Sequence, residues 1–193
     1  MTRRGSYAKG VARREEILES ALEVIGSRGY QNASLKQIAE VVGVTPAALL
    51  HYFGSKEELF TAVLRKRDEH DGMDPRLLDI ADASEGLIDV IRHNTEVPGL
   101  VELFSRLAVD AADPAHPAHD YFLERSEQLR RSVAASFDRA AGREPLLDPD
   151  TMARVIQAVA DGLQLQWMID PSVDMAGIVE KLIDALAPRS SAS

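Results

Sequence analysis

A very short helical segment, residues 46–52, lies between two sets of helix-ending and helix-starting residues, and this spacing constrains the fold more than any other feature. Gly43 stands where a left-handed residue would end one helix. Thr45 then offers an N-cap oxygen, and Pro46 suits the first position of the next helix because its missing N–H costs nothing there. Gly54 would end that helix after about two turns, which is too short to be stable alone. The pattern predicts a helix-turn-helix whose second helix is held in place by its neighbours.

Two capping boxes place the flanking helices. Ser34 is followed three residues later by Gln37, and Ser55 is followed by Glu58, so a helix should begin just after each serine. The apolar side chains expected to anchor the short helix from behind are Leu49 and Phe53.

Apolar residues recur at helical spacing along the whole 193-residue chain. The residues Leu35, Ile38, Ala39 and Val42, for example, follow the i, i+3, i+4, i+7 rule, and Gly29 is placed to end the preceding helix. The pattern gives nine helix candidates and no alternating run of β-branched residues, so the fold class is predicted to be all-α. With 45% hydrophobic residues, the chain can bury one large core or two modest ones.

Charge is divided unevenly along the chain. Residues 1–70 carry 11 Lys/Arg against 9 Asp/Glu, a net of +2, whereas residues 71–193 carry 11 against 22, a net of −11. The first fourteen residues hold five basic side chains and no acidic one, which is typical of a basic arm that binds a polyanion, although a solvated tail can have the same composition. Lys56, Arg13 and Arg14 would lie near helix starts, where the macrodipole disfavours cations; phosphate contact would explain that placement.

Several classes of function are excluded or disfavoured. Cysteine is absent, which excludes disulfides, thiolate metal sites and cysteine nucleophiles. The N-terminus has no apolar leader and no run is long enough to span a bilayer, so we expect a soluble, cytoplasmic protein with no membrane contact. No phosphate-binding glycine loop or hydrolase motif is found, so we expect no enzyme and no cofactor. One cluster could be drawn as a metal site: Asp113, His116, His119 and Asp120. A loop that starts a helix, with Pro117 in its first turn, is the simpler interpretation.

Three segments together resemble the N-terminal signature of the TetR-type transcriptional repressors over roughly residues 11–64: SLKQIA at 34–39, GVT at 43–45 and HYFGSKEEL at 51–59. A helix-turn-helix alone is a weak signal, but one followed at once by Tyr-Phe-x-Ser-Lys-x-x-Leu is specific. The resemblance implies a three-helix DNA-binding domain (11–56), a connecting helix (57–72) and a ligand-binding and dimerisation domain (73–187). Composition adds a flexible basic arm (1–10) before them and a disordered tail (188–193) after them.

The resemblance also implies which residues contact DNA. By position, the residues facing bases would be Thr45, Ala47, Ala48 and His51, and those contacting phosphates would be Ser34, Lys36, Tyr52 and Lys56. The chain departs from the commonest pattern at two positions, with Leu50 in place of a frequent aromatic residue and Ala47 in place of a frequent glycine. The second helix of the helix-turn-helix, residues 46–52, has no Arg, Asn or Gln to read guanine or adenine. We therefore expect it to contact thymine methyl groups and to form one hydrogen bond through His51, and we expect an imperfect, A·T-tolerant operator.

Ligand and dimer contacts are expected in the acidic second part. Gln157, Asp161 and Gln164 share one face of an otherwise apolar helix; a solvated face is the simpler explanation and a pocket wall is the alternative. Further lining candidates are Phe104, Tyr121, Phe122 and Arg125. Two amphipathic helices could form a two-fold interface through Val155, Val159, Leu163, Ile178, Leu182 and Leu186.

The function expected from these features is a homodimeric transcriptional repressor that an unidentified small molecule releases from a palindromic operator. Two other classes stay open. One is a helical metal-binding protein or enzyme that uses the cluster at residues 113–120. The other is a DNA-binding protein that responds to no ligand.

Overall fold

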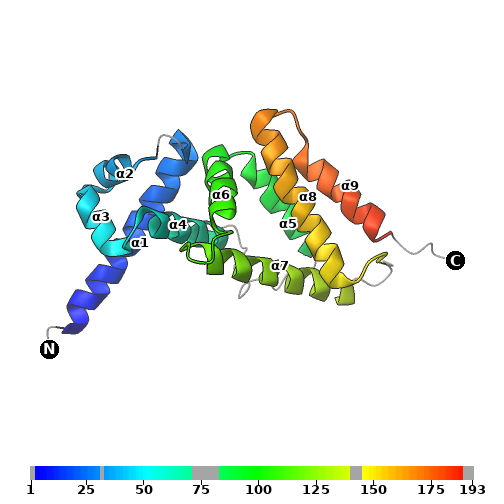
Figure 1. Cartoon of the computed structure of the whole chain (residues 1–193), viewed down its shortest axis with the longest axis horizontal. Helices are drawn as coiled ribbons and strands as arrows, with labels where there is room; N and C mark the ends of the chain where they lie inside the picture. Colours follow the sequence, from blue (N-terminus) through cyan, green and yellow to red (C-terminus); the bar gives the residue numbers. More distant parts are fainter. Residues whose placement is uncertain (1–2, 31–32, 71–82, 140–144, 189–193) are drawn as a thin grey trace. The chain divides into compact units, whose positions relative to one another are not determined.

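The computed structural model describes residues 3–30, 33–70, 83–139 and 145–188, and within them it contains nine α-helices and no β-strand. This confirms the predicted all-α fold class. The helices, in chain order, are α1 (Arg3–Arg28), α2 (Leu35–Val42), α3 (Pro46–Phe53), α4 (Lys56–His70), α5 (Ala83–Asn94), α6 (Pro98–Asp110), α7 (His119–Arg139), α8 (Pro149–Ile169) and α9 (Met175–Leu186) (Figure 1). Among these helices, none is both long and apolar enough to cross a membrane.

The described residues form two compact units. The first combines the described part of residues 1–70 with Val97–Tyr121, and the second combines the described parts of residues 71–96 and 122–193. Helix α7 therefore begins in the first unit and continues in the second. The sequence expectation assigned all of residues 73–187 to one domain, whereas α6 packs with the N-terminal helices. The expected boundary between the connecting helix and the second domain, at residues 72 and 73, lies outside the described residues.

In the first unit, α1 packs against α2, α4 and α6, and α3 packs against α2 and α4. Figure 1 shows α2 and α3 following one another at one end of this group. Its core is aliphatic and fully buried at Ile17, Ile25, Ile38, Leu49, Leu59, Leu64 and Leu103. Each such side chain contributes roughly 1.5–3 kcal/mol through burial. The two-turn helix α3 is stable in this setting because Leu49 and Phe53 insert into that core, as predicted.

The helix ends follow the predicted capping chemistry. Helix α1 ends at Arg28 before Gly29, whose φ is 79°. Ser34 and Gln37 form both bonds of a capping box at the start of α2, and Gly43 ends that helix in the left-handed conformation. At α4, the Ser55 amide donates to Glu58 Oε2 at 3.1 Å and the Glu58 amide donates to Ser55 Oγ at 3.0 Å.

The start of α1 differs from the expected flexible arm. The structure continues the helix back to Arg3, so residues 3–10 are helical. No proline interrupts this stretch, and its glycines weaken a helix by only about 1 kcal/mol each. Arg13 and Arg14 therefore lie inside a long helix rather than near its start, and the macrodipole argument does not apply to them.

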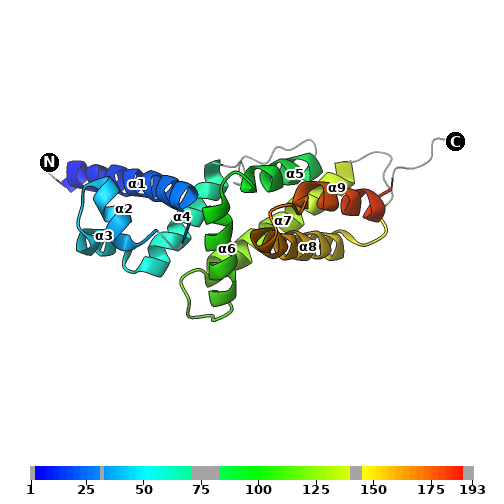
Figure 2. The same cartoon turned by 90° about the horizontal axis from the view of Figure 1, so that it is seen from above.

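In the second unit, α5 and α8 both pack against α9, and Figure 2 shows α8 and α9 side by side. Asp148 caps α8 by accepting a 3.0 Å hydrogen bond from the Thr151 amide, and Asp174 caps α9 through the Gly177 amide at 2.9 Å. The buried apolar side chains include Met152, Ile156, Leu163, Trp167, Val179 and Ile183.

Candidate nucleic-acid interface

Helix α3 has one face buried and one face exposed. Thr45 Oγ1 accepts a 3.1 Å hydrogen bond from the Ala48 amide and so fixes the start of the helix, with Pro46 in its first turn. Gly54 ends it at φ 88° and ψ −60°. The exposed side chains of the helix are Pro46, Ala47, Leu50 and His51, while Ala48 and Tyr52 are half-buried. A short helix supported from behind and exposed in front has the geometry needed to enter a major groove.

The residues predicted to contact phosphates lie around this helix. Lys36 and Lys56 are exposed in the first turns of α2 and α4, the helices on either side. Ser34 is also exposed, and its hydroxyl donates to Gln37 Oε1 at 2.9 Å within the capping box. Helix N-termini present free amide groups to anions, so the starts of α2 and α4 can each hold a phosphate beside a lysine.

The Lys56 ammonium group lies over two aromatic rings. Its Nζ is 5.1 Å from the Phe60 ring centre and 5.9 Å from the Tyr30 ring centre. The two rings pack edge to face at 5.6 Å, and the Arg106 guanidinium lies 5.5 Å from the centre of Tyr30. Burial raises the pKa of Tyr30 above its usual range. Contact with a ring limits the conformations of a long lysine side chain, which lowers the entropy cost of holding it against a phosphate.

Two arginines that the sequence suggested for phosphate contact have structural partners. Arg13 Nη2 donates to the Val42 carbonyl oxygen at 2.8 Å, and Arg13 Nη1 pairs with Glu16 at 2.5 Å. The bond to Val42 satisfies a carbonyl at the end of α2 and joins α1 to the helix-turn-helix. Arg14 lies 4.5 Å from the centre of the Phe53 ring. Both side chains therefore help to hold α2 and α3 in place.

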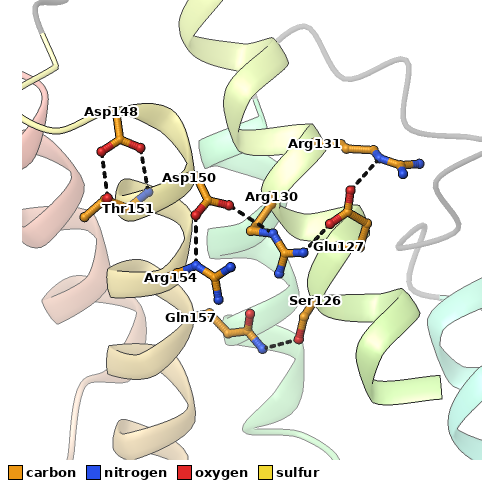
Figure 3. Close-up of polar contacts among 9 residues, drawn as sticks. All are labelled: Ser126, Glu127, Arg130, Arg131, Asp148, Asp150, Thr151, Arg154 and Gln157. Atoms are coloured by element: carbon orange, nitrogen blue, oxygen red, sulfur yellow. Dashed lines mark hydrogen bonds and ion pairs between the residues drawn. The ribbon is translucent and has the colours of Figure 1, made fainter. Parts of the chain in front are cut away.

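The predicted polar stripe of α8 is half-buried rather than solvated, and α7 supplies partners for Gln157 and Asp161. Gln157 Nε2 donates to Ser126 Oγ of α7 at 3.0 Å (Figure 3). About two turns towards the start of α8, Asp150 accepts from Arg130 of α7 at 3.1 Å and from Arg154 at 2.9 Å, as Figure 3 also shows. The Gln157–Ser126 and Asp150–Arg130 contacts bridge α7 and α8, whereas the Asp150–Arg154 pair lies within α8.

Asp161 lies at the centre of that stripe. Burial raises the pKa of the Asp161 carboxyl above its usual range, while the Arg125 charge and a hydrogen bond from Gln157 act in the opposite direction. Gln164 Oε1 is a buried acceptor that receives no hydrogen bond in the described part of the chain. The structure thus brings together Arg125, Gln157 and Asp161 and leaves one amide oxygen without a donor. A polar ligand could form hydrogen bonds with these groups, whereas apolar core packing would leave them unsatisfied.

Two other predicted pocket residues contact side chains of the first unit. Tyr121 is 3% exposed, and its hydroxyl donates to Asp68 Oδ2 at 2.6 Å. Phe104 is buried under the Arg67 guanidinium, which lies 5.3 Å from its ring centre. Phe122, the next residue along α7, is half-buried and belongs to the second unit. Tyr121 and Phe104 therefore support α4 and α6 within the first unit.

Known proteins give an independent view of the whole chain. A family model described as bacterial regulatory proteins of the tetR family matches residues 17–63. The HTH-type transcriptional regulator TtgR of Pseudomonas putida is 30% identical over 191 residues, which cover 89% of this chain and 88% of that protein. The HTH-type transcriptional repressor AcnR of Corynebacterium efficiens is 28% identical over 189 residues, covering 94% and 95%. This chain belongs to the TetR family.

The fold agrees with a solved structure of low sequence identity. A putative transcriptional regulator from Saccharomonospora viridis, crystallised in complex with choline, superposes with a TM-score of 0.64 at 22% identity over 90% of this chain and 96% of that one. The TetR-family membership makes this protein a DNA-binding transcriptional regulator, and its relatives are regulators rather than enzymes.

The histidines that the alternative metal-site hypothesis uses are bonded to their own loop in this TetR-family protein. His119 Nδ1 lies 2.8 Å from the Ala111 carbonyl oxygen, and the Ala118 amide donates to His116 Nδ1 at 3.1 Å. Over the described ranges, no three His, Asp or Glu side chains converge as metal ligands would. Pro117 lies in the loop before α7, which begins at His119, and not in its first turn as predicted.

The predicted dimer residues are divided between buried and exposed positions. Leu163 is 5% exposed and packs within its own unit, whereas Ile178 is exposed and the remaining four are half-buried: Val155, Val159, Leu182 and Leu186. An exposed apolar stripe that the sequence reasoning missed runs along α8 through Ala158, Leu165 and Ile169, with Leu165 and Ile169 51% and 87% exposed. The i, i+7, i+11 spacing of these residues could have revealed it.

Proposed function

We propose that this TetR-family regulator is a homodimeric repressor that acts in the cytoplasm, binds a palindromic operator through α3, and leaves the operator when a small molecule binds the second unit. The observation that carries the DNA part is the geometry of α3. Capping bonds at Thr45 and two buried anchors hold its position, while Ala47 and His51 face solvent. A basic side chain stands at the start of each flanking helix, at Lys36 and Lys56.

In this proposal the DNA contacts divide by role. The residues that face bases are Thr45, Ala47, Ala48 and His51, and the residues that contact phosphates are Ser34, Lys36, Tyr52 and Lys56. The Thr45 hydroxyl oxygen caps α3, and its methyl group is available to meet a thymine methyl group. His51 supplies a hydrogen bond, and its ring packs edge to face with Tyr52 at 6.1 Å. Phosphate contacts fix position and base contacts give specificity.

Dimerisation would bury the exposed apolar faces of α8 and α9. Leu165, Ile169 and Ile178 are large apolar side chains left exposed by one protomer. Two antiparallel helices from each protomer would form a four-helix interface about a two-fold axis, with Val155, Val159, Leu182 and Leu186 at its edges. Two α3 helices related by that axis would then face half-sites about one helical turn apart.

The ligand part of the proposal rests on the polar residues between α7 and α8. Arg125, Gln157 and Asp161 lie together, and Gln164 offers a buried acceptor. The choline complex of the related fold supports a small polar molecule as the effector class. Release would follow if the ligand binds better to a dimer whose α3 spacing does not match the operator, because a ligand shifts an equilibrium only by its differential affinity.

One experiment tests both parts. Full-length protein is used to select binding sites from a randomised duplex DNA library, and affinity for the selected site is measured by fluorescence anisotropy. A palindromic site should be enriched, and at least one compound from a panel of small amines and metabolites, beginning with choline, should lower the affinity. Failure to enrich any site would contradict operator binding. An enriched site that no compound weakens would contradict ligand release alone.

A further inference from the structure

The outward face of α3 carries a large apolar side chain. Ala47, Leu50 and His51 stand at i, i+3 and i+4 on one side of the helix, and all three are exposed. Leu50 is 38% exposed, whereas Leu49 beside it is fully buried and Phe53 is 5% exposed. The side chain of Leu50 therefore points away from the core that holds α3.

This face has few means of forming hydrogen bonds with bases. Of its three side chains, only His51 has a hydrogen-bonding group. The hydroxyl oxygen of Thr45, at the N-terminal edge, accepts a hydrogen bond from the Ala48 amide, so this hydroxyl is held at the start of the helix. The face is therefore mainly apolar, and the apolar group that a base pair presents in the major groove is the C5-methyl group of thymine.

We propose that Leu50 is a specificity-determining residue that contacts a thymine methyl group in each operator half-site. The inference rests on the proposed operator binding by α3. Leu50 reaches farther than the methyl group of Ala47, so its isobutyl group can meet a base edge that Ala47 cannot. The contact makes thymine preferred over cytosine at that position without any hydrogen bond, because cytosine places a polar amino group and no methyl group there.

Removal of a single methyl group tests the contact directly. Binding sites are first selected from a randomised duplex library with the wild-type protein and with Leu50→Ala. Each thymine of the wild-type site is then replaced in turn by deoxyuridine, which lacks only the C5-methyl group. At one position in each half-site, the wild-type protein should bind about fourfold more weakly per methyl group removed, the effect of one buried methyl group. Leu50→Ala should bind thymine and deoxyuridine equally there and should select thymine less often.

Leu123→Ala is the matched control, because Leu123 is an exposed leucine of α7 at 58% exposure. It should keep the wild-type preference at every position. If deoxyuridine lowered the affinity of the wild type and of Leu50→Ala equally, the role of Leu50 would be overturned, while operator binding would stand. The role of Leu50 would also be overturned if the wild type did not distinguish thymine from deoxyuridine at any position. A Leu50→Ala protein that changes its oligomeric state and keeps the wild-type sequence preference would overturn it as well. A wild type that enriches no site would overturn the proposed function and the Leu50 contact together.

Discussion

The hydroxyl of Tyr121 donates a 2.6 Å hydrogen bond to the carboxylate of Asp68, which joins the first turn of α7 to the last turn of α4. Asp68 also accepts from Arg67 Nη2 at 3.1 Å, and the Arg65 guanidinium lies 5.2 Å from the centre of the Tyr121 ring. Helix α4 directly follows the helix-turn-helix. The contact therefore holds the helix that positions α3 against a helix that continues into the second unit.

Tyr121→Phe should lower the free energy of unfolding by about 1–3 kcal/mol, because it removes a buried hydrogen bond to a charged group and keeps the ring. Urea denaturation at one fixed protein concentration measures the change. Asp68→Asn and the double variant complete a cycle that isolates the pair. If the losses of unfolding free energy in Tyr121→Phe and Asp68→Asn add up to the loss in the double variant, the hydrogen bond contributes nothing.

Gly99→Ala should destabilise the first unit by about 1–3 kcal/mol. A Cβ atom at Gly99 would collide with the Ile25 carbonyl oxygen and with Cα of Gly29, and these backbone atoms cannot turn aside. Gly10→Ala is the matched control: its Cβ meets no neighbour, so alanine should stabilise α1 by up to about 1 kcal/mol. The same urea titration compares the two. Unchanged stability in Gly99→Ala would refute the close packing of α1 on α6, and an unchanged Gly10→Ala would argue against a helix at that position.

Asp161→Asn should be more stable than the wild type at neutral pH, and the difference should shrink as the pH falls. Burial raises the pKa of Asp161 in the folded protein above the unfolded value of about 3.9. The folded state therefore binds more protons in the window between the two values, and wild-type stability decreases as the pH rises through it. Unfolding titrations of both proteins between pH 4 and 7.5 provide the comparison. A stability difference that is independent of pH, or largest at pH 4, would contradict the raised pKa of Asp161.

Leu165→Glu should give folded monomers that no longer bind the operator, because it places a charge on the exposed apolar stripe of α8. Leu182→Glu, on the half-buried side of α9, should act in the same direction. Leu123→Glu puts the same charge on an exposed leucine of α7 and should leave the dimer intact. Sedimentation equilibrium, with circular dichroism as a check on folding, gives the oligomeric state. A folded Leu165→Glu protein that is still a dimer would place the interface elsewhere.

The parts of the structure that could be predicted from sequence depend on residues close together in the chain. The capping box of Ser34 and Gln37 joins residues three apart, so a pattern of residue types is enough to predict it. The Tyr121–Asp68 bond joins residues 53 apart, and no local pattern indicates it. The phosphate contact expected of Arg13 depends on a helix that starts near it, whereas α1 starts at Arg3 and Arg13 bonds to the Val42 carbonyl where α1 packs against α2.

The candidate sites follow the same division. His51 and Lys56 could be placed by the signature that contains them, and both are exposed where it implies. The polar stripe of α8 was visible as a spacing, but whether it faced water or α7 depended on tertiary packing. The expected anchor Leu49 is fully buried, whereas the sequence predicted no contact for Leu50, whose exposure depends on how α3 packs against its neighbours.

The most direct test of the account is the ratio of affinities for the selected operator and for random-sequence DNA, measured at one fixed salt concentration for the wild type, Lys56→Ala and His51→Ala. The wild-type ratio should be on the order of 10³ or more. Lys56→Ala should weaken both affinities and leave the ratio almost unchanged, because a phosphate contact carries no sequence information, whereas His51→Ala should lower the ratio through a changed preference at one position in each half-site. A wild-type ratio near one, or an equal fall in the ratio for both variants, would contradict the account.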